Sequence, residues 1–363
     1  MEQAVQYRPC RIIVPAMAGK PATSPDWIRP KPEGLTIAAS DGCQALVVDA
    51  MRKSPLVAVT HGHADHARPG NGHVIATPQT LDIMAARYGA GFAQEVTPLE
   101  YHRPLQLGMT TLTLKPAGHV LGSAQILLER GGQRVVISGD YKRKPDPTCD
   151  AFVPVPCDIF ITEATFALPV FRHPDPAAEI DRLLASLALF PERCHVIGAY
   201  SLGKAQRLIR LIRDTGYDAP IFLHGALVKL CQLYERWGVE LGPLLPATAG
   251  EKGKPRAELA GKLVLAPPSA IADRWARRLP DALVVMASGW MQVRQRAKQA
   301  GVELPLVLSD HADWDDLLRT IREVNPREVW VTHGREDALI HACAQIGIRG
   351  RALKMIGYGE EGE

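Results

Sequence analysis

Residues 56–66, LVAVTHGHADH, join a short apolar run to a cluster of three histidines and one aspartate. The run is predicted to be a buried β-strand, because it is short, rich in β-branched residues and followed by a turn-forming segment. His61, His63, Asp65 and His66 would then lie in a tight loop at the carboxyl end of this strand. Imidazole and carboxylate groups are the ligands of Zn²⁺, Mn²⁺ and Fe²⁺. The stretch therefore predicts a metal site built on a β-rich fold.

Further candidate ligands follow other predicted strands or lie just beyond them, where loops gather on one rim. They are Asp49, His119, Asp140, Glu163, His311 and His333. Taken singly, each is more often a structural residue, but together they complete the ligand set of a two-metal centre. Two metals about 3.5–4 Å apart need a carboxylate that bridges them. Asp140 suits that role, because the preceding Gly139 lets the backbone turn sharply.

The composition is that of a folded protein with one large domain or two ordinary ones. The chain has 363 residues, of which 46% are hydrophobic, enough for a substantial core. No stretch approaches the roughly 18 apolar residues of a membrane span, so we expect a cytoplasmic protein with no membrane contact. The seven cysteines are odd in number, scattered and never spaced as Cys-x-x-Cys. This pattern predicts reduced, mostly buried thiols.

The first half of the chain is predicted to be mainly strands. The predicted strands are residues 45–49, 56–60, 74–77, 110–114, 125–128, 134–138 and 158–162, with one helix at 78–88. From Asp175 helices and strands alternate, a rhythm typical of parallel α/β structure. The helices are 176–189, 202–213, 227–237 and 271–279, and the strands are 195–199, 220–223, 262–266 and 282–286. Residues 242–255 are predicted to be a loop.

The strand-rich pattern of the first half returns near the end of the chain. We predict a strand at 305–309, a helix at 314–324 and a strand at 328–332. We therefore expect an inserted domain, after which the chain returns to complete the first one. Residues 175–305 hold 18 Lys and Arg against 13 Asp and Glu, a net charge of +5, whereas the remainder carries −2. This excess predicts an anionic partner for the insertion, with an ordinary basic surface as an equal alternative.

The motifs together resemble those of the metallo-β-lactamase superfamily and, within it, the β-CASP nucleases. The features of the β-CASP branch are Glu163 after a strand, His311 in Ser-Asp-His-Ala-Asp, and His333 in Val-Thr-His-Gly. Residues 66–70, 118–125, 201–208 and 288–291 also resemble the bacterial DNA-ligase-associated exonucleases, relatives of the DNA-crosslink-repair and Artemis nucleases. The resemblance implies an α/β fold, an αββα sandwich formed by residues 1–174 and 306–363, with an inserted β-CASP domain at 175–305.

The resemblance also implies a role for each candidate residue around two divalent cations, Zn²⁺ as bound and Mn²⁺ as an alternative in activity. One metal would be held by His61, His63 and His119, and the other by Asp65, His66 and His333, with Asp140 bridging. Asp49 would orient a histidine. Glu163 and His311 would form a hydrogen-bonded pair in which His311 meets the scissile phosphate or its leaving oxygen. Asp65, Asp140, Glu163 and His311 are thus the expected catalytic residues.

The helix beginning near Ser201 is a candidate phosphate site. Ser201 is predicted to cap it, Gly203 to permit close approach, and its first N–H groups to face an anion. Lys204, Arg207 and Arg210 follow at a spacing of three and would form one basic ridge along the nucleic acid. The alternative is an amphipathic helix with a solvated basic face.

The leading hypothesis is a metal-dependent DNA exonuclease that hydrolyses phosphodiester bonds in repair, alongside a DNA ligase. The nearest alternative is an RNA-processing β-CASP ribonuclease, because His333 is more typical of that branch. A thioesterase or lactamase is a more distant alternative, and a scaffold without activity is the non-enzymatic one. The expected partners are DNA, as a single strand or strand end, with RNA as the alternative.

Overall fold

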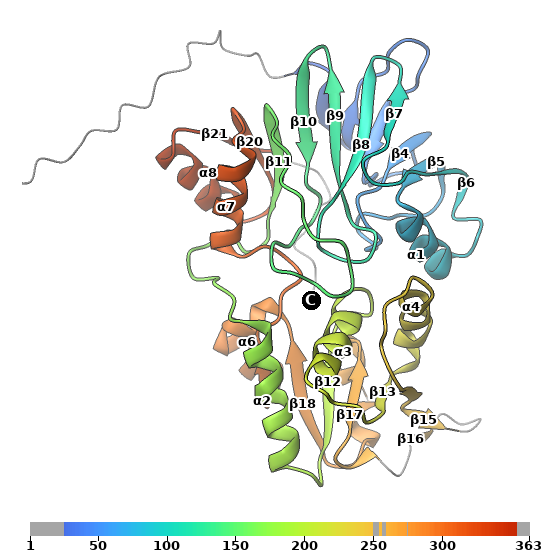
Figure 1. Ribbon diagram of the computed structural model, residues 1–363, viewed down its shortest axis with the longest axis vertical. Coiled ribbons are helices and arrows are strands. Elements are labelled where there is room, and N and C mark those ends of the chain that lie inside the picture. The colour runs from blue at the N-terminus through green and yellow to red at the C-terminus, as the bar shows by residue number, and fades with distance from the viewer. Residues whose placement is uncertain (1–24, 250–253, 256–258, 274, 354–363) are drawn as a thin grey trace, which may run out of the picture.

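The computed structural model describes residues 25–249, 254–255, 259–273 and 275–353. Figure 1 shows two lobes, an upper one with two facing sheets and a lower one with a third sheet. The chain starts in the upper lobe, passes into the lower lobe at helix α2 (Pro176–Leu189) and returns at helix α7 (Trp314–Val324). The expected insertion is therefore a separate lobe in the structure.

The first sheet of the upper lobe carries the histidine-rich loop. Its strands, in spatial order, are β1 (Ile28–Lys31), β2 (Gly34–Ile37), β3 (Leu46–Val48), β4 (Leu56–Ala58), β5 (Asn71–Ala76) and β6 (Ala93–Pro98). Strands β3 to β6 are parallel. Helix α1 (Pro78–Tyr88) covers its outer face, and Thr77 caps that helix by accepting a hydrogen bond from the Thr80 N–H.

The second sheet supplies the loops that face this one. Its order is β21 (Arg349–Ala352), β20 (Glu328–Gly334), β11 (Ile159–Ala164), β10 (Gln133–Ile137), β9 (Ala124–Arg130), β8 (Thr110–Pro116) and β7 (Pro104–Leu107). Helices α7 and α8 (Glu336–Gln345) pack on its outer side. Strand β11 is buried along its whole length, because both faces of the sheet are covered. The predicted αββα sandwich is confirmed.

The third sheet forms the lower lobe and is parallel throughout. Its order is β14 (Leu244–Pro246), β13 (Ile221–Leu223), β17 (Leu263–Ala266), β12 (Cys194–Gly198), β18 (Ala282–Ala287) and β19 (Leu304–Leu306). Helices α2, α3 (Lys204–Asp214) and α4 (Gly225–Arg236) cover it. The predicted α/β alternation with parallel pairing is confirmed for this lobe.

The secondary structure predicted for two segments of the lower lobe is wrong. The expected helix at 271–279 is a short helix α5 (Pro268–Ala272) and a 3-10 turn (Ala276–Arg278), separated by Asp273 in an extended conformation. Pro268 starts α5 earlier than the apolar pattern suggested, because proline favours the first helical position. The expected loop at 242–255 contains β14 and a small hairpin of β15 (Thr248–Ala249) and β16 (Lys254–Pro255).

The predicted strand at 305–309 is also corrected. Strand β19 is shorter and pairs with β18 in the third sheet, so it completes the lower lobe instead of returning to the upper one. It is preceded by a 3-10 turn (Gly289–Gln292) and helix α6 (Arg294–Gln299), which the sequence patterns did not predict. The division of the chain after residues 174 and 305 stays a prediction, and β19 crosses the second of these positions.

The two lobes share a hydrophobic core. Ile83 of α1 and Leu121 of the β8–β9 loop lie in the same buried cluster as Leu202 and Leu208 of the lower lobe. The lobes pack closely, because a Cβ added at Gly62 would lie 3.4 Å from Leu202 Cδ2 of the lower lobe. This packing holds the start of α3 against the histidine-rich loop.

The findings on membrane spans and cysteines concern the described residues only. None of their helices is long and apolar enough to cross a membrane. Six cysteines in this part of the chain are free thiols, three of them buried. Cys10, also expected to be reduced, lies outside the described residues.

Candidate metal centre

The loop after β4 brings three imidazoles together. The N–H groups of His66 and Ala67 both donate to the His63 carbonyl, which closes a tight turn. The ring centroids of His61 and His66 are 4.1 Å apart, and those of His61 and His63 are 4.9 Å apart. The sequence motif therefore folds into a compact cluster of potential ligands.

Two residues of the second sheet complete this cluster. His119 comes from the β8–β9 loop and Asp140 from the turn after β10, and both are buried. One ligand atom from each of His61, His63, His119 and Asp140 lies within 4.8 Å of all the others. The Oδ2 atom of Asp140 lies 3.5, 3.6 and 3.8 Å from Nε2 of His61, His66 and His119, respectively. Asp140 thus occupies the central position expected of a bridging carboxylate.

Asp49 and Thr60 fix the orientation of two histidines. Asp49 accepts hydrogen bonds from the Thr60 N–H (2.8 Å), the Thr60 hydroxyl (2.7 Å) and His66 Nδ1 (2.7 Å). Because the single Thr60 hydroxyl proton is donated to Asp49, Thr60 Oγ1 accepts from His61 Nδ1 at 3.0 Å. His61 therefore carries its proton on Nδ1 and directs its Nε2 lone pair towards Asp140, while His66 donates its Nδ1 proton to Asp49. Such outer hydrogen bonds are what metal-binding histidines require.

His119 and His63 are oriented in the same way by backbone carbonyls. His119 Nδ1 donates to the Asp310 carbonyl (2.9 Å), and His63 Nε2 donates to the Leu202 carbonyl (3.2 Å). The remaining ring nitrogens, His119 Nε2 and His63 Nδ1, then face each other at 3.0 Å with a lone pair each. His61 Nε2 is buried and has no hydrogen-bond partner among the described residues. Converging lone pairs of this kind fit a cation, so the residues present suit Zn²⁺.

The electrostatics of the cluster favour the neutral form of His61 and His119. Burial lowers the pKa of His61 and of His119 well below the usual histidine value, and neighbouring imidazoles lower it further. Burial opposes the charged form of His66 too, but Asp140 and Asp49 hold its pKa well above the usual value. Neutral imidazole is the form that binds metal.

The second predicted ligand set is only partly described. Asp65 Oδ2 lies 3.5 Å from His66 Nε2, and its side chain is 41% exposed, so it lines the accessible side of the cluster. His333 lies in β20, the strand beside β11, but its side chain lies outside the described residues. Its assignment as a ligand stays a prediction.

Glu163 and His311 form a pair next to the cluster. Glu163 Oε2 lies 2.8 Å from His311 Nδ1, and its carboxylate also accepts from the Tyr141 N–H (2.7 Å) and the Thr165 hydroxyl (2.6 Å). Ligand atoms of Asp140, Glu163 and His311 lie within 4.8 Å of one another. The ring centroid of His311 is 4.8 Å from that of His119. The pair thus lies beside the bridging carboxylate.

The start of α3 differs from its prediction. Ser201 does not cap the helix; the capping residue is Gly203, whose N–H donates to Gln206 Oε1 at 2.8 Å. The N–H groups of Lys204 and Ala205 donate to nearby backbone carbonyls. The N–H groups of Gly203, Lys204 and Ala205 are therefore already engaged. Gly203 has a φ of +84°, and an added Cβ would lie 2.3 Å from Val120 Cγ1.

The expected basic ridge of α3 is divided. Lys204 and Arg207 are buried, with 6% and 3% of their surface exposed, and both pair with Asp310. Arg210 faces outward and pairs with Asp214 of its own helix at 2.8 Å. The nucleic-acid contacts proposed for these residues stay predictions, but only Arg210 lies on an accessible face.

Sequence reasoning missed three groups of this centre: the Thr60 hydroxyl, the Leu202 carbonyl and Asp310. Asp310 precedes His311 in a motif that the sequence had singled out, and its polar character at that position was a usable signal. The other two carry no signal, because a carbonyl and a threonine acquire their role only through tertiary contacts.

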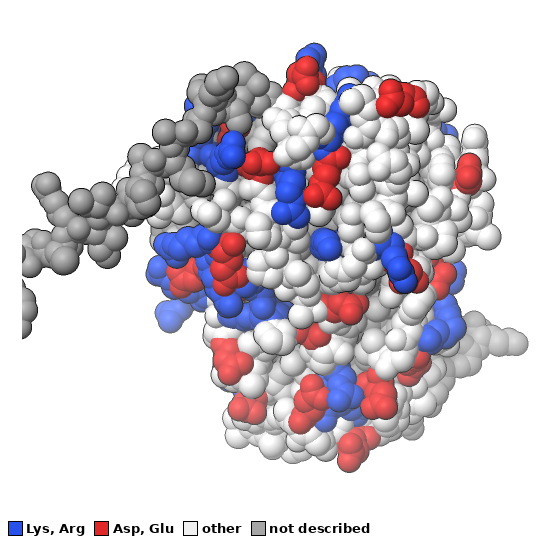
Figure 2. Space-filling model, turned by 45° about the horizontal axis from the view of Figure 1, so that its top comes forward, with Lys and Arg blue, Asp and Glu red and all other residues white. Residues whose placement is uncertain are grey.

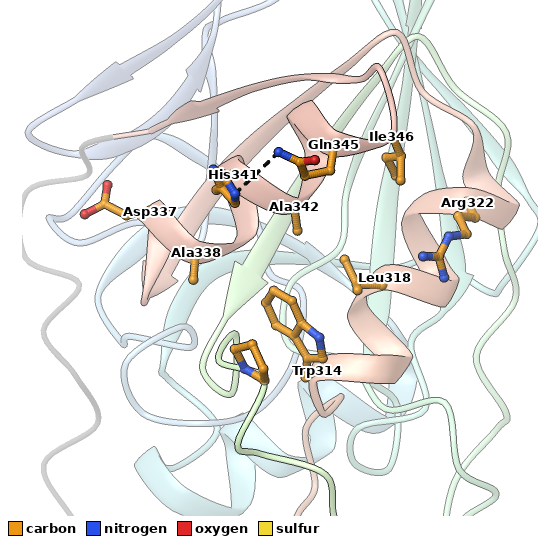
Figure 3. Close-up of a pocket in the computed structure, with 10 residues that line it drawn as sticks. Trp314, Leu318, Arg322, Asp337, Ala338, His341, Ala342, Gln345 and Ile346 are labelled. Carbon is orange, nitrogen blue, oxygen red and sulfur yellow. Dashed lines mark hydrogen bonds between the residues drawn. The ribbon is translucent and has the colours of Figure 1, made fainter.

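Charged residues of both signs are intermixed on one face of the molecule. In the face shown in Figure 2, lysine and arginine side chains alternate with aspartate and glutamate, so this face carries no unbroken basic surface. A cavity of about 520 Å³ lies elsewhere, between α7 and α8 (Figure 3). Trp314, Leu318 and Ala342 line its apolar floor, and none of its lining residues is a predicted site residue.

The αββα sandwich, with a buried His/Asp cluster at the ends of its strands, is the architecture of the metallo-β-lactamase fold. Residues 300–352 match the family described as "Zn-dependent metallo-hydrolase RNA specificity domain". The inserted lobe and the Glu163–His311 pair agree with the resemblance to the β-CASP nucleases noted in the sequence.

Similar proteins cover most of the chain. It is 29% identical to a "Probable DNA ligase" of Opitutus terrae over 81% of this chain and 28% of that protein, so it spans less than a third of that relative. It is 26% identical to "Ribonuclease TTHA0252" of Thermus thermophilus over 84% of this chain and 86% of that protein. A crystal structure of a protein of unknown function from Enterococcus faecalis shares the fold, with a TM-score of 0.52, 14% identity and coverage of 81% of this chain and 77% of that one.

Proposed function

We propose that this chain is a metal-dependent nuclease that hydrolyses phosphodiester bonds, and that it digests DNA from a strand end in repair, together with a DNA ligase. The observation that carries the nuclease proposal is the Glu163–His311 pair, with its 2.8 Å hydrogen bond, next to the four-residue metal cluster. A metal cluster alone suits many hydrolases, whereas a paired histidine beside it adds a group that can protonate a leaving oxygen.

Each residue of the site has a separate role in the proposed hydrolysis. Bound divalent cations would activate water and neutralise charge on the phosphate. Asp140 holds the centre of the cluster, and Asp65 lines its accessible side. Glu163, fixed by the Tyr141 N–H and the Thr165 hydroxyl, binds Nδ1 of His311 and favours its cationic form. His311 would then donate the proton from Nε2 to the departing deoxyribose oxygen.

DNA is the preferred substrate because of the long match to a protein named as a DNA ligase. A segment of that relative is similar to 81% of this chain, which favours a shared task with a ligase. The end-directed mode rests on the resemblance of residues 118–125 and 201–208 to ligase-associated exonucleases. An RNA-processing nuclease is the second candidate, because the Thermus relative is named a ribonuclease and the family matched by residues 300–352 is described as an RNA specificity domain.

One assay separates these candidates. Purified protein is incubated with DNA and RNA of matched sequence, single- and double-stranded, labelled at either end, with and without a 5′-phosphate, in Zn²⁺ or Mn²⁺. We expect progressive shortening of DNA from one end and no reaction in excess chelator. Cleavage of RNA alone would replace the DNA proposal by the RNA one. Hydrolysis of a thioester without cleavage of either nucleic acid would reject the nuclease proposal.

A further inference from the structure

We propose that Arg207 of the inserted lobe is a positioning residue of the metal centre, which holds His119 and His311 in place through the loop that contains Asp310. This inference reassigns a residue that the sequence pattern had favoured as a phosphate contact. It rests on the proposed nuclease function only for its kinetic consequences. Its consequences for metal binding stand independently of the substrate.

Arg207 contacts the loop directly. It lies in the first turn of α3, and its Nη1 atom donates to the Ser309 carbonyl and, at 3.2 Å, to Asp310 Oδ1. Both side chains are buried, with Arg207 3% and Asp310 4% exposed. Because Nη1 contacts both a backbone and a side-chain oxygen of the loop, this contact restrains the position and the orientation of the loop.

The contact belongs to a buried network that joins both lobes. Asp146, in the segment between β10 and β11, lies 3.5 Å from Arg207 Nε and accepts a hydrogen bond from Lys142. Lys204 lies 3.8 Å from the second oxygen of Asp310. Burial alone would raise the pKa of Asp310, but Lys204 and Arg207 lower it below its usual value. Buried charges are costly unless each is paired, so this network sets a specific arrangement of the two lobes.

The loop passes this arrangement on to the metal cluster. The Asp310 carbonyl accepts the hydrogen bond from His119 Nδ1 at 2.9 Å, so a shift of the loop rotates the ring of a metal-binding histidine. His311, the partner of Glu163, is the next residue. A second link comes from the same part of the lower lobe, where the Leu202 carbonyl accepts from His63 Nε2. Residues 202–207 therefore orient two of the four clustered ligands.

This geometry differs from that of a phosphate contact in a measurable way. An arginine that is 3% exposed and already paired with the Asp310 carboxylate is not accessible to a nucleic-acid phosphate. Removing a phosphate contact weakens substrate binding and reduces its salt dependence. Removing a group that orients a metal ligand instead weakens metal binding and slows the reaction, typically by about 10–100-fold.

The test compares Arg207→Lys and Arg207→Gln with Arg213→Lys. Lysine keeps the buried charge but cannot bind the loop and Asp146 at once, so this variant is expected to fold even if the glutamine variant does not. Arg213 is the matched control, because it lies on the same helix and also binds backbone carbonyls, at Leu241, Tyr217, Ala219 and Pro243, which all lie within the lower lobe.

Zn²⁺ affinity is measured by competition with a chromophoric chelator, and the site is followed by the visible spectrum of the Co²⁺-substituted protein. We expect Arg207→Lys to weaken Zn²⁺ binding about tenfold and to change the Co²⁺ spectrum. The kcat should fall about tenfold with KM for an oligonucleotide changed less than about twofold. Arg213→Lys should match the wild type in all of these, even if it melts earlier.

Unchanged metal affinity and spectrum in Arg207→Lys would overturn the proposal. A raised KM, with a salt dependence of binding reduced by about one in slope, would instead identify Arg207 as a phosphate contact. A wild-type protein that cleaves no nucleic acid would reject the proposed function, while the Zn²⁺ and Co²⁺ measurements would still decide the role of Arg207.

Discussion

Asp49 and His66 are joined by a 2.7 Å hydrogen bond between Oδ2 and Nδ1, although they follow different strands and are 17 residues apart. The same carboxylate receives both the N–H and the hydroxyl of Thr60. Asp49 adopts a positive φ of 47°, an unusual conformation for a residue other than glycine. Backbone strain at a residue with three buried hydrogen bonds points to a role in the site.

Asp49→Asn is expected to weaken metal binding by about 10–100-fold, because the amide presents an N–H group to one of three donors that all need an acceptor. Chelator competition for Zn²⁺ measures this effect. Glu95→Gln is the control, since Glu95 is an exposed carboxylate whose partner is His73 on the neighbouring strand. Wild-type affinity in Asp49→Asn would contradict the orienting role.

Asp65→Ala is expected to abolish cleavage while the protein stays folded. The Asp65 side chain is 41% exposed, so its removal opens no cavity in the core, but it lies 3.5 Å from His66 Nε2 in the cluster. Cleavage of labelled DNA and thermal unfolding followed by circular dichroism are measured together. Cleavage at the wild-type rate would refute the role of Asp65.

His311→Ala is expected to reduce kcat by about 10²–10⁴-fold with a smaller change in KM, because a proton donor acts in the transition state. Glu163→Gln should lower kcat in the same direction, since the neutral amide no longer favours the cationic form of His311. His341→Ala, in the groove between α7 and α8, is the control. Equal kcat values for His311→Ala and the wild type would end this assignment.

Removing metal is expected to lower the melting temperature. His63 Nδ1 and His119 Nε2 face each other at 3.0 Å with lone pairs, an arrangement that a bound cation stabilises. Metal at about 100 times its Kd would add about 2.7 kcal/mol to the free energy of unfolding. Melting curves with excess chelator and with added Zn²⁺ should therefore differ. Identical curves would indicate that the cluster binds no metal in the folded protein.

Gly203→Ala is expected to destabilise the protein by about 1–3 kcal/mol through overpacking, in addition to the strain of a positive φ. The added Cβ would lie 2.3 Å from Val120 Cγ1 at the interface of the lobes. Gly216→Ala separates the two effects, because Gly216 has a similar φ of +86° but nothing within 4 Å of an added Cβ. Equal losses of stability in urea unfolding would show that overpacking plays no part.

The elements predicted with the correct bounds are those whose signals are local. Helices α1, α2 and α7 begin and end as predicted, because Thr77, Asp175 and Asp313 cap them and prolines follow the first two caps. Strand β19 was assigned to the wrong lobe, because its neighbour β18 is a long-range partner that no local pattern identifies.

The residues of the site also divide into those with a local sequence signal and those whose role depends on long-range contacts. The ligands His61, His63, His119 and Asp140 carry their chemistry in the side chain, so their types and positions made them candidates, and the structure brings them together. The hydrogen bonds that orient them come from Thr60 and from the carbonyls of Leu202 and Asp310, whose roles exist only after the lobes have packed. Lys204 and Arg207 looked solvent-facing because their burial depends on the opposite lobe.

The cluster shared by Ile83, Leu121 and Leu202 has a consequence for how the whole chain behaves. Swinging the lobes apart would expose these apolar side chains to water and would at the same time remove the carbonyl that orients His63. The two lobes should therefore melt in one calorimetric transition instead of two. If the proposed function is correct, a nucleic-acid strand would then reach the metal cluster along the interface between the lobes, without the lobes moving apart.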